Sequence, residues 1–497
     1  MARYFSHHTL LGHFQSNARV RLVAILAVVT TISLFIMTFR TGLPSLHLQN
    51  PNHAAMFETA DAIIESSRRY IEEPLPSSAF GEMGNRTAML TRWMEEAVTL
   101  KPSLSKKKSA LLTAQLEDAV VSMYPFLKNP TNPKDPLPFT TRRKNIIPGS
   151  KGIVLTCGKS HFRYALHFIG SIRNVLLSDL PVQVMYAGDD DLPKHHRQIL
   201  TSMFRDVETL DLLTVFDDTT IDLRHGTWAI KSFAILASKF EQVLAVDADA
   251  VFLQKPEVVF ESHSGYRSRG ALLFHDRLLW QNMFVDRTKW WQNEMGSRTP
   301  SDTLQKSKVW TEGYAEECDS GVVALDKGRL PVLMALLHIC WQNSADVRTQ
   351  WTYQLTYGDK ESWWFGLELC AVPFVFEDHY AAVLGKTEMR DDQKSVCSFS
   401  IAHLDERAKL LWYNGSLLKN KAVNLTDFLV PEAWMVDGEW VKGNAKAELS
   451  CMRKTDIRTV DEGVRTIIGD SIAVAQRLDK EVQDMGIDLV TDSDMHL

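Results

Sequence analysis

Residues Val243–Phe252, V-L-A-V-D-A-D-A-V-F, form the stretch that most constrains the fold. A short apolar run ends in two aspartates, Asp247 and Asp249, one residue apart. Such a run predicts a buried strand that stops where its carboxylates meet solvent. Two carboxylates at a strand end suit Mg²⁺ or Mn²⁺, which take one or two protein carboxylates together with substrate phosphates. The alternative is a solvated strand-end turn, since a lone D-x-D is common.

The chain beyond Lys151 alternates predicted strands with predicted helices. Strands are expected over 152–157, 182–187, 270–274, 321–325 and 399–404, and helices over 161–177, 192–204, 227–240, 330–341 and 361–370. This alternation predicts an α/β fold in which helices cover a sheet. Ligands of such sheets bind at the carboxyl ends of the strands. Gly158, after the first strand, and Asp247 are therefore expected to share one cleft.

The N-terminal region predicts a membrane anchor followed by a stem. Residues 22–39 carry no charge and are just long enough to span a bilayer, and the poor cleavage site that follows favours a retained signal anchor over a cleaved signal peptide. The excess of arginine before the span places residues 1–21 in the cytosol and the bulk of the chain in the lumen. Residues 40–150 are expected to form a lumenal stem with helical segments, 151–440 the α/β domain, and 441–497 a C-terminal helical extension with an acidic tail.

Charge, sequons and cysteines restrict the partners and the compartment. The formal net charge of −6 argues against a nucleic-acid partner. Sequons at Asn85, Asn414 and Asn424 agree with a lumenal chain. The six cysteines follow the predicted span, so some should pair in an oxidising compartment. Cys157, on a predicted strand, is expected to be a small core residue instead.

Six segments of the domain, the D-x-D stretch among them, can be compared with known families by their order and spacing. They are Trp228–Ser238, Val243–Glu257, Gly270–Arg277, Asp319–Lys327, Tyr357–Gly366 and His403–Gly415. Together they resemble the fungal Golgi α-1,3-mannosyltransferases, over about residues 150–420. The stem and the C-terminal helix do not take part in the resemblance.

The resemblance implies a GT-A-type nucleotide-sugar-binding fold, with a mixed, mostly parallel sheet between helices on both faces. It also implies GDP-mannose as the donor, Mn²⁺ as the cofactor, and retention of the donor's anomeric configuration. The expected location is the Golgi membrane, with single-pass type II topology and a lumenal catalytic domain. A mannose-containing glycan is the expected acceptor, and other Golgi glycosyltransferases are expected as partners in a complex.

Several residues receive donor-side roles from the resemblance. Asp247 and Asp249 would hold the metal and the diphosphate. His403, after a late strand, would complete the metal shell, because imidazole suits Mn²⁺ better than Mg²⁺; a structural histidine is the alternative. Lys231 would offer a cation to the diphosphate, or would be an ordinary lysine on a helix surface. Gly158 is expected beside the donor.

The remaining candidates surround the sugar. Asp276 and Arg277 would bind the hydroxyls of the donor sugar or pair with one another. Asp319 is expected on the β-face of that sugar, as the nucleophile of a covalent route or as the charge that stabilises a front-face route. Asp359 and Glu361 would bind sugar hydroxyls, or would only favour the start of a helix, where carboxylates are common.

Two functions of different classes follow. The first is a GDP-mannose-dependent α-mannosyltransferase that forms an α-1,3 linkage with retention in protein glycosylation. The second is a non-catalytic, metal-dependent glycan-binding or scaffold protein with a degenerate transferase fold. A glycosidase fits less well, because it needs two carboxylates flanking one bond rather than a metal-type spacing. The acceptor remains open among N-linked, O-linked and lipid-linked glycans.

Overall fold

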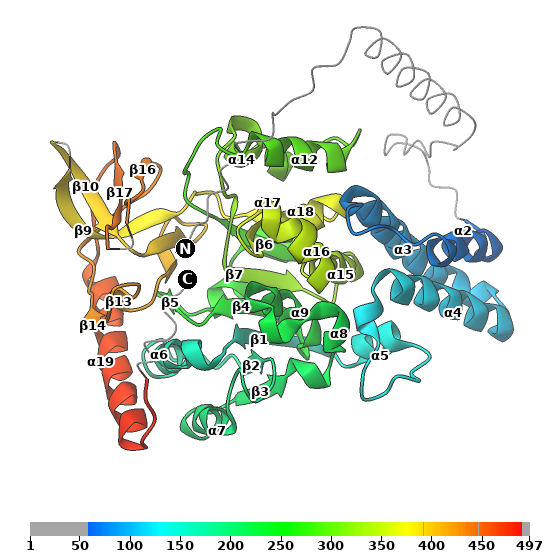
Figure 1. Ribbon diagram of the computed structural model, residues 1–497, viewed down its shortest axis with the longest axis horizontal. Helices are drawn as coiled ribbons and strands as arrows, with labels where there is room; N and C mark the ends of the chain where they lie inside the picture. The colour runs from blue at the N-terminus through cyan, green and yellow to red at the C-terminus, as the bar shows by residue number, and fades with distance from the viewer. Residues whose placement is uncertain (1–57, 391, 446, 490–497) are drawn as a thin grey trace, which may run out of the picture. The chain divides into compact units, whose positions relative to one another are not determined.

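The computed structural model describes residues 58–390, 392–445 and 447–489. These residues belong to one compact unit (Figure 1). The predicted cytosolic tail and membrane span, residues 1–39, lie outside the described part of the chain. Within the described ranges, no helix combines the length and the apolar character that crossing a membrane requires.

A seven-stranded sheet, in the order β3-β2-β1-β4-β7-β6-β8, organises this unit. Its strands are β1 (Ile147–Thr156), β2 (Val182–Tyr186), β3 (Val207–Asp211), β4 (Phe240–Asp247), β6 (Ala271–His275), β7 (Cys318–Asp326) and β8 (Val375–Phe376). Strand β7 runs antiparallel to β4 and β6, and the other pairs are parallel. The predicted mixed, mostly parallel sheet is confirmed. Because β7 is reversed, its first residues lie at the same edge of the sheet as the last residues of β4.

Side chains that alternate along β4 explain why both faces of the sheet are covered. Val243 and Ala245 belong to one hydrophobic cluster, whereas Leu244 and Val246 belong to a second. The first cluster also holds side chains of α3 (Phe80–Leu100), α4 (Lys106–Met123), α9 (Ile230–Ala237), α15 (Leu330–Gln342) and α18 (Lys360–Leu369). The second holds side chains of α6 (Phe162–Asn174), α7 (Lys194–Met203) and α19 (Glu462–Asp484). Helices therefore lie on both faces, as predicted.

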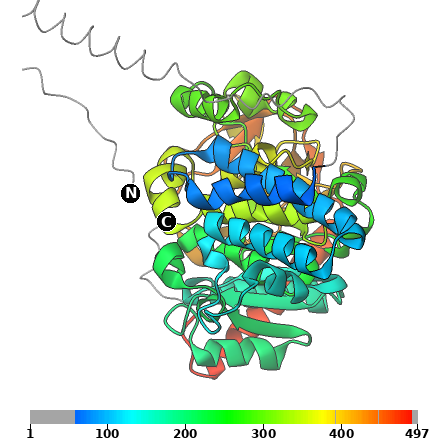
Figure 2. The ribbon, with the colours of Figure 1, turned by 90° about the vertical axis from the view of Figure 1, so that its right-hand side faces the viewer.

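The helices expected within residues 40–150 are part of the same core. Helices α2 (Ala60–Glu72), α3 and α4 lie side by side, in blue and cyan in Figure 2, and α5 (Pro138–Lys144) follows them. The ring of Phe80, on α3, packs against Trp341 of α15 at a centroid separation of 4.9 Å. The predicted domain boundary at residue 150 thus falls inside one packed unit rather than between two.

A second sheet, antiparallel and of nine strands, stands beside the first, and the sequence predicted only one of its strands, over 399–404. Its strands are β5 (Ala250–Phe252), β9 (Ala382–Arg390), β10 (Gln393–Ser398), β11 (Ile401–Leu404), β12 (Leu410–Asn414), β15 (Ala433–Met435), β16 (Glu439–Val441), β17 (Ser450–Arg453) and β18 (Arg458–Thr459). Strand β5 begins three residues after β4 ends. The two aspartates of the D-x-D stretch therefore lie at the junction of the two sheets.

Cysteines and the C-terminal helix behave as predicted, whereas the helices predicted over 161–177 and 227–240 are both shorter than expected. A disulfide joins Cys397 on β10 to Cys451 on β17, and Cys157 is buried and free. Helix α19 lies in the C-terminal extension, residues 441–497, that was predicted to be helical, and an ion pair joins it to α6. The helix predicted over 227–240 ends at Ala237 instead, because Phe240 already begins β4.

Candidate active site

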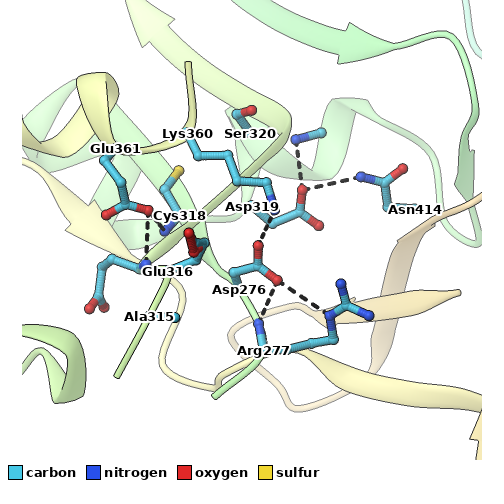
Figure 3. A network of polar contacts seen from close by, with 12 residues as sticks. Asp276, Arg277, Ala315, Glu316, Cys318, Asp319, Ser320, Lys360, Glu361 and Asn414 are labelled. Atoms are coloured by element: carbon cyan, nitrogen blue, oxygen red, sulfur yellow. Dashed lines mark hydrogen bonds and ion pairs between the residues drawn. The ribbon is translucent and has the colours of Figure 1, made fainter. Parts of the chain in front are cut away.

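One edge of the seven-stranded sheet, which we call the site edge, gathers most of the predicted residues. Asp247 is the last residue of β4, Asp319 is the second residue of β7, and Asp276 directly follows β6. His403 on β11 and Asn414 on β12 reach the same edge from the second sheet, where both contact Asp319. The site is therefore built by both sheets, and Figure 3 shows Asp319 between Asn414 and Lys360.

The two aspartates of the D-x-D stretch each pair with a lysine. Oδ1 of Asp247 lies 2.8 Å from Nζ of Lys231, and Asp249 forms an ion pair with Lys421. Burial raises the pKa of Asp247; the charge of Lys231 opposes this rise and the charge of Asp249 adds to it. A second carboxylate that raises the pKa of Asp247 also favours a cation at this strand end. The donor set fits Mn²⁺ or Mg²⁺ with phosphate oxygens as further ligands.

Lys231 is buried and is not the surface lysine of the alternative prediction. Its Nζ donates a hydrogen bond to the carbonyl oxygen of Ser320 (2.7 Å) and lies 3.5 Å from Oδ2 of Asp359. Burial lowers its pKa, but the charges of Asp247 and Asp359 outweigh burial and raise it, so the ammonium stays charged. Lys231 therefore connects the ends of β4, β7 and α18.

Asp319 is 1% exposed and is surrounded by hydrogen-bond donors. Its Oδ1 accepts bonds from the backbone N–H of Gly321 (2.9 Å) and from Nδ2 of Asn414 (3.2 Å), and its Oδ2 lies 2.9 Å from Nε2 of His403. The ring of His403 stacks on Trp412 at a centroid separation of 4.2 Å. Burial alone would raise the pKa of Asp319, but the bond from His403 and the charges of His403 and Lys360 hold it well below the usual range.

The predicted metal set is only partly assembled. Among the described residues, no group of three or more histidine, cysteine, aspartate or glutamate side chains could hold a metal ion together. His403 lies against Asp319 at 2.9 Å and, within the described ranges, forms no such group with Asp247 and Asp249. The two aspartates remain as the candidate metal ligands.

Asp276 and Arg277 pair with one another, as one of the two predictions had it. Oδ1 of Asp276 accepts a bond from the backbone N–H of Arg277 (2.6 Å) and lies 3.7 Å from its Nε. Its Oδ2 pairs with Lys360, a residue that the sequence analysis missed (Figure 3). Lys360 lies between Asp359 and Glu361, two residues that the resemblance singled out, and this position could have marked it as a site residue.

Asp359 and Glu361 have partners inside the protein. The indole N–H of Trp363 donates to Asp359 (2.9 Å) and that of Trp364 donates to Glu361 (2.6 Å). Glu361 also accepts a bond from the backbone N–H of Glu317 (3.0 Å). Both carboxylates are 1% exposed, and burial together with the charge of Glu316 raises the pKa of Glu361. Through these bonds and one from the hydroxyl of Ser320, they anchor the start of α18 to β7, a role that neither prediction gave them.

Gly158 follows β1 and lies near Asp191. A Cβ atom at Gly158 would lie 2.3 Å from Oδ1 of Asp191, so only glycine allows this approach. Since β1 pairs with β4 in parallel, Gly158 lies at the site edge, as expected. Two residues were missed: Asn414 on β12, which the sequence predicted as a sequon, and Lys421, which directly follows the short strand β13 (Leu418–Asn420).

Comparison with known proteins agrees with the resemblance. Residues 150–405 match a protein family described as "Mannosyltransferase putative". The chain is 26% identical over 329 residues to the "Putative alpha-1,3-mannosyltransferase MNN1" of Candida albicans, over 56% of this chain and 40% of that protein. It is 24% identical over 346 residues to alpha-1,3-mannosyltransferase MNN1 of Saccharomyces cerevisiae, over 59% of this chain and 43% of that protein.

The matched part spans less than half the length of these two curated relatives. Among solved structures, a galactosyltransferase, LgtC, in complex with donor and acceptor sugar analogues is 13% identical with a TM-score of 0.28. That match covers 44% of this chain and 70% of the solved chain.

Proposed function

We propose that this chain, which belongs to the mannosyltransferase family matched by residues 150–405, transfers mannose from GDP-mannose to a mannoside acceptor. We propose an α-1,3 linkage and retention of configuration. The observation that carries the proposal is Asp319, a buried carboxylate kept charged at the site edge where Asp247 and Asp249 also lie. A fixed negative charge there suits the positive charge that develops on the anomeric carbon when the diphosphate leaves.

The D-x-D aspartates supply the donor side of the proposed mechanism. Asp247 and Asp249 would hold Mn²⁺, since two carboxylates with phosphate oxygens make a suitable ligand set. When bound, the cation would stabilise negative charge on the departing diphosphate as a Lewis acid. Lys231 keeps Asp247 in place through the 2.8 Å ion pair and connects it to the strand that carries Asp319.

The acceptor side depends on how Asp319 is held. Its carboxylate accepts bonds from a backbone N–H and from the amide of Asn414, and His403 lies against its other oxygen. These contacts fix its orientation before substrate binds, which is the condition under which an electrostatic contact lowers a barrier. Both retaining routes, the covalent one and the front-face one, place this demand on the same carboxylate.

The alternative function, a non-catalytic glycan-binding or scaffold protein, explains the site less well. Burying an ionised carboxylate is costly unless hydrogen bonds or charges compensate it. Asp319 has this compensation from three separate segments of the chain. A scaffold protein has no need of such an arrangement, whereas a transferase does.

We further propose that the protein is a single-pass type II protein of the Golgi membrane, in which other glycosyltransferases are its partners. The apolar stretch at residues 22–39 supports the anchor. The disulfide between Cys397 and Cys451 supports an oxidising compartment, since stable disulfides are rare in the cytosol.

The direct test incubates the purified full-length chain with a panel of nucleotide sugars, Mn²⁺ and simple α-mannosides. We expect transfer from GDP-mannose alone, loss of transfer in EDTA, and an α-1,3-linked product by proton NMR. A β-anomeric product would contradict retention. Glycan binding without transfer from any nucleotide sugar would favour the scaffold alternative.

A further inference from the structure

Two exposed aromatic side chains, Trp228 and Tyr357, lie next to the site and have no part in the mechanism above. The chain has 13 tryptophans, all within the described ranges, and only Trp228 and Trp280 are exposed, at 38% and 46%. Tyr357 is 59% exposed, and its ring centroid lies 5.4 Å from that of Trp228. Large aromatic side chains left in contact with water cost free energy, and clusters of them usually mark a binding surface.

Trp228 is held rigidly from behind. Gly358 has a φ of +63°, and a Cβ atom at this position would lie 2.8 Å from Cδ2 of the indole. The loop backbone therefore packs directly against the indole ring, which only glycine permits. The ring of Tyr353 also packs against Trp228, at a centroid separation of 6.0 Å. The hydroxyl of Tyr353 donates a 2.9 Å hydrogen bond to Oδ1 of Asn343, which fixes its position. The indole is thus positioned by the fold before any ligand arrives.

The aromatic pair lies next to the site, close in the chain to two of its charged residues. Trp228 lies in the 3₁₀ turn η6 (Thr227–Ala229), which leads directly into α9 and Lys231. Tyr357 lies two residues before Asp359, and Nζ of Lys360 lies 5.9 Å from its ring centroid. Lys360 in turn pairs with Asp276 at the site edge. A ligand stacked on the two rings would therefore reach charged groups of the site.

We propose that Trp228 and Tyr357 form an acceptor subsite that stacks on a pyranose ring of the glycan. The identity of the ligand rests on the proposed function. One face of a pyranose presents C–H groups of partial positive charge, which the negative face of an aromatic ring attracts. The hydroxyls of the pyranose would point outward, to polar groups such as Lys360. Specific sites commonly combine aromatic walls with a few polar groups in this way.

The flat guanine base of the donor is the competing occupant, and kinetics separates the two. In Trp228→Ala and Tyr357→Ala, we expect the KM for the mannoside acceptor to rise about five- to tenfold, the size of a lost aromatic contact. The KM for GDP-mannose and its hydrolysis by water should stay within about twofold. Trp228→Phe should keep most of the acceptor affinity. Leu111→Ala, on α4 and 51% exposed, is the matched control and should change neither KM.

Direct binding of methyl α-mannoside to the full-length chain, followed by saturation-transfer NMR, makes the result independent of turnover. If the wild type binds and Trp228→Ala does not, the subsite is supported. If, in addition, the wild type transfers no mannose, only the proposed function is overturned. Transfer and binding that both persist in the two alanine variants would overturn the subsite and leave the proposed function standing. A rise confined to the donor KM would assign the rings to the base and overturn the subsite. A wild type that neither binds nor transfers would overturn both.

Discussion

The two halves of the site compensate the charges of their carboxylates in different ways. At the end of β4, Asp247 and Asp249 each pair with a lysine ammonium group. At the start of β7, Asp319 accepts bonds from a backbone N–H and the amide of Asn414, and it lies against His403. A carboxylate paired with a cation can exchange it for another cation, whereas one held by fixed donors keeps both its charge and its orientation. The β4 half is therefore suited to binding, and the β7 half to stabilising charge during the reaction.

Asp319→Asn should break the β7 half most severely. The amide keeps the shape of the side chain but removes the charge that stabilises the sugar in the transition state. We expect kcat to fall by about a hundred- to a thousandfold, the usual cost of one lost transition-state contact, with little change in the KM for GDP-mannose. Steady-state kinetics with the thermal midpoint as a folding control checks this. A kcat within a few fold of wild type would remove Asp319 from the mechanism.

Asp249→Asn should break the β4 half through its cation. Loss of one carboxylate should raise the Mn²⁺ concentration for half-maximal activity by about tenfold or more. Lys421→Met should act in the opposite direction, because it removes the cation that competes for Asp249 in the structure. Metal titrations of the two variants provide the comparison. Shifts in the same direction would show that Lys421 and the metal do not compete for this carboxylate.

His403→Phe should show that the histidine serves Asp319 rather than the metal. Phenylalanine keeps a ring stacked on Trp412 but leaves Oδ2 of Asp319 without its partner. Burial raises the pKa of Asp319 and His403 lowers it, so loss of the histidine should raise this pKa. Because the carboxylate is active when ionised, the acidic limb of the kcat profile should move to higher pH, with about a tenfold loss of kcat at low pH.

Two measurements sharpen this test of His403. The Mn²⁺ titration of His403→Phe should match wild type, and a weaker metal affinity would return His403 to the metal shell. His403→Gln, whose amide can still donate to Asp319, should keep the acidic limb closer to its wild-type position.

The sequence predicted the two halves unequally. The β4 half could be found because Asp247 and Asp249 end one apolar run, and the α/β alternation places strand ends together. The sequence could not show that Lys421 contacts Asp249 or that His403 contacts Asp319, because these partners lie 172 and 84 residues apart in the chain. His403 lies on β11 of the second sheet and Lys421 directly follows β13 (Leu418–Asn420), and such short strands give little periodic signal. The same reasoning explains Glu361. Its neighbours in the sequence gave no sign that the backbone N–H groups of Glu317 and Cys318, at the start of β7, would donate to its carboxylate.

Lys327, a third buried charge, extends the comparison with the smallest expected effect on activity, since no carboxylate of the described residues pairs with it. Nζ of Lys327 donates bonds to the carbonyl oxygens of Ile235 (2.8 Å) and Ser238 (2.6 Å). Burial, with the charge of Arg142 adding to it, lowers the pKa of Lys327 from 10.5 to about 7, in contrast to Lys231. Carbonyl oxygens thus do not compensate an ammonium group as Asp247 and Asp359 do.

Lys327→Met should therefore change how stability depends on pH rather than how fast the enzyme turns over. Between about pH 7 and pH 10, the unfolded wild type binds one proton more than the folded protein, so its free energy of unfolding should rise with pH, by up to about 1.4 kcal/mol per unit. The methionine variant should lose this slope, while kcat stays within about twofold, because Lys327 lies at the opposite end of β7 from Asp319. Urea denaturation at pH 7 and pH 9 measures the slope, with Lys239→Met, a surface variant whose side chain is 39% exposed, as the control. An equal slope in all three proteins would mean that Lys327 stays charged in the fold, and that carbonyl oxygens compensate an ammonium group as well as the carboxylates of the β4 half do.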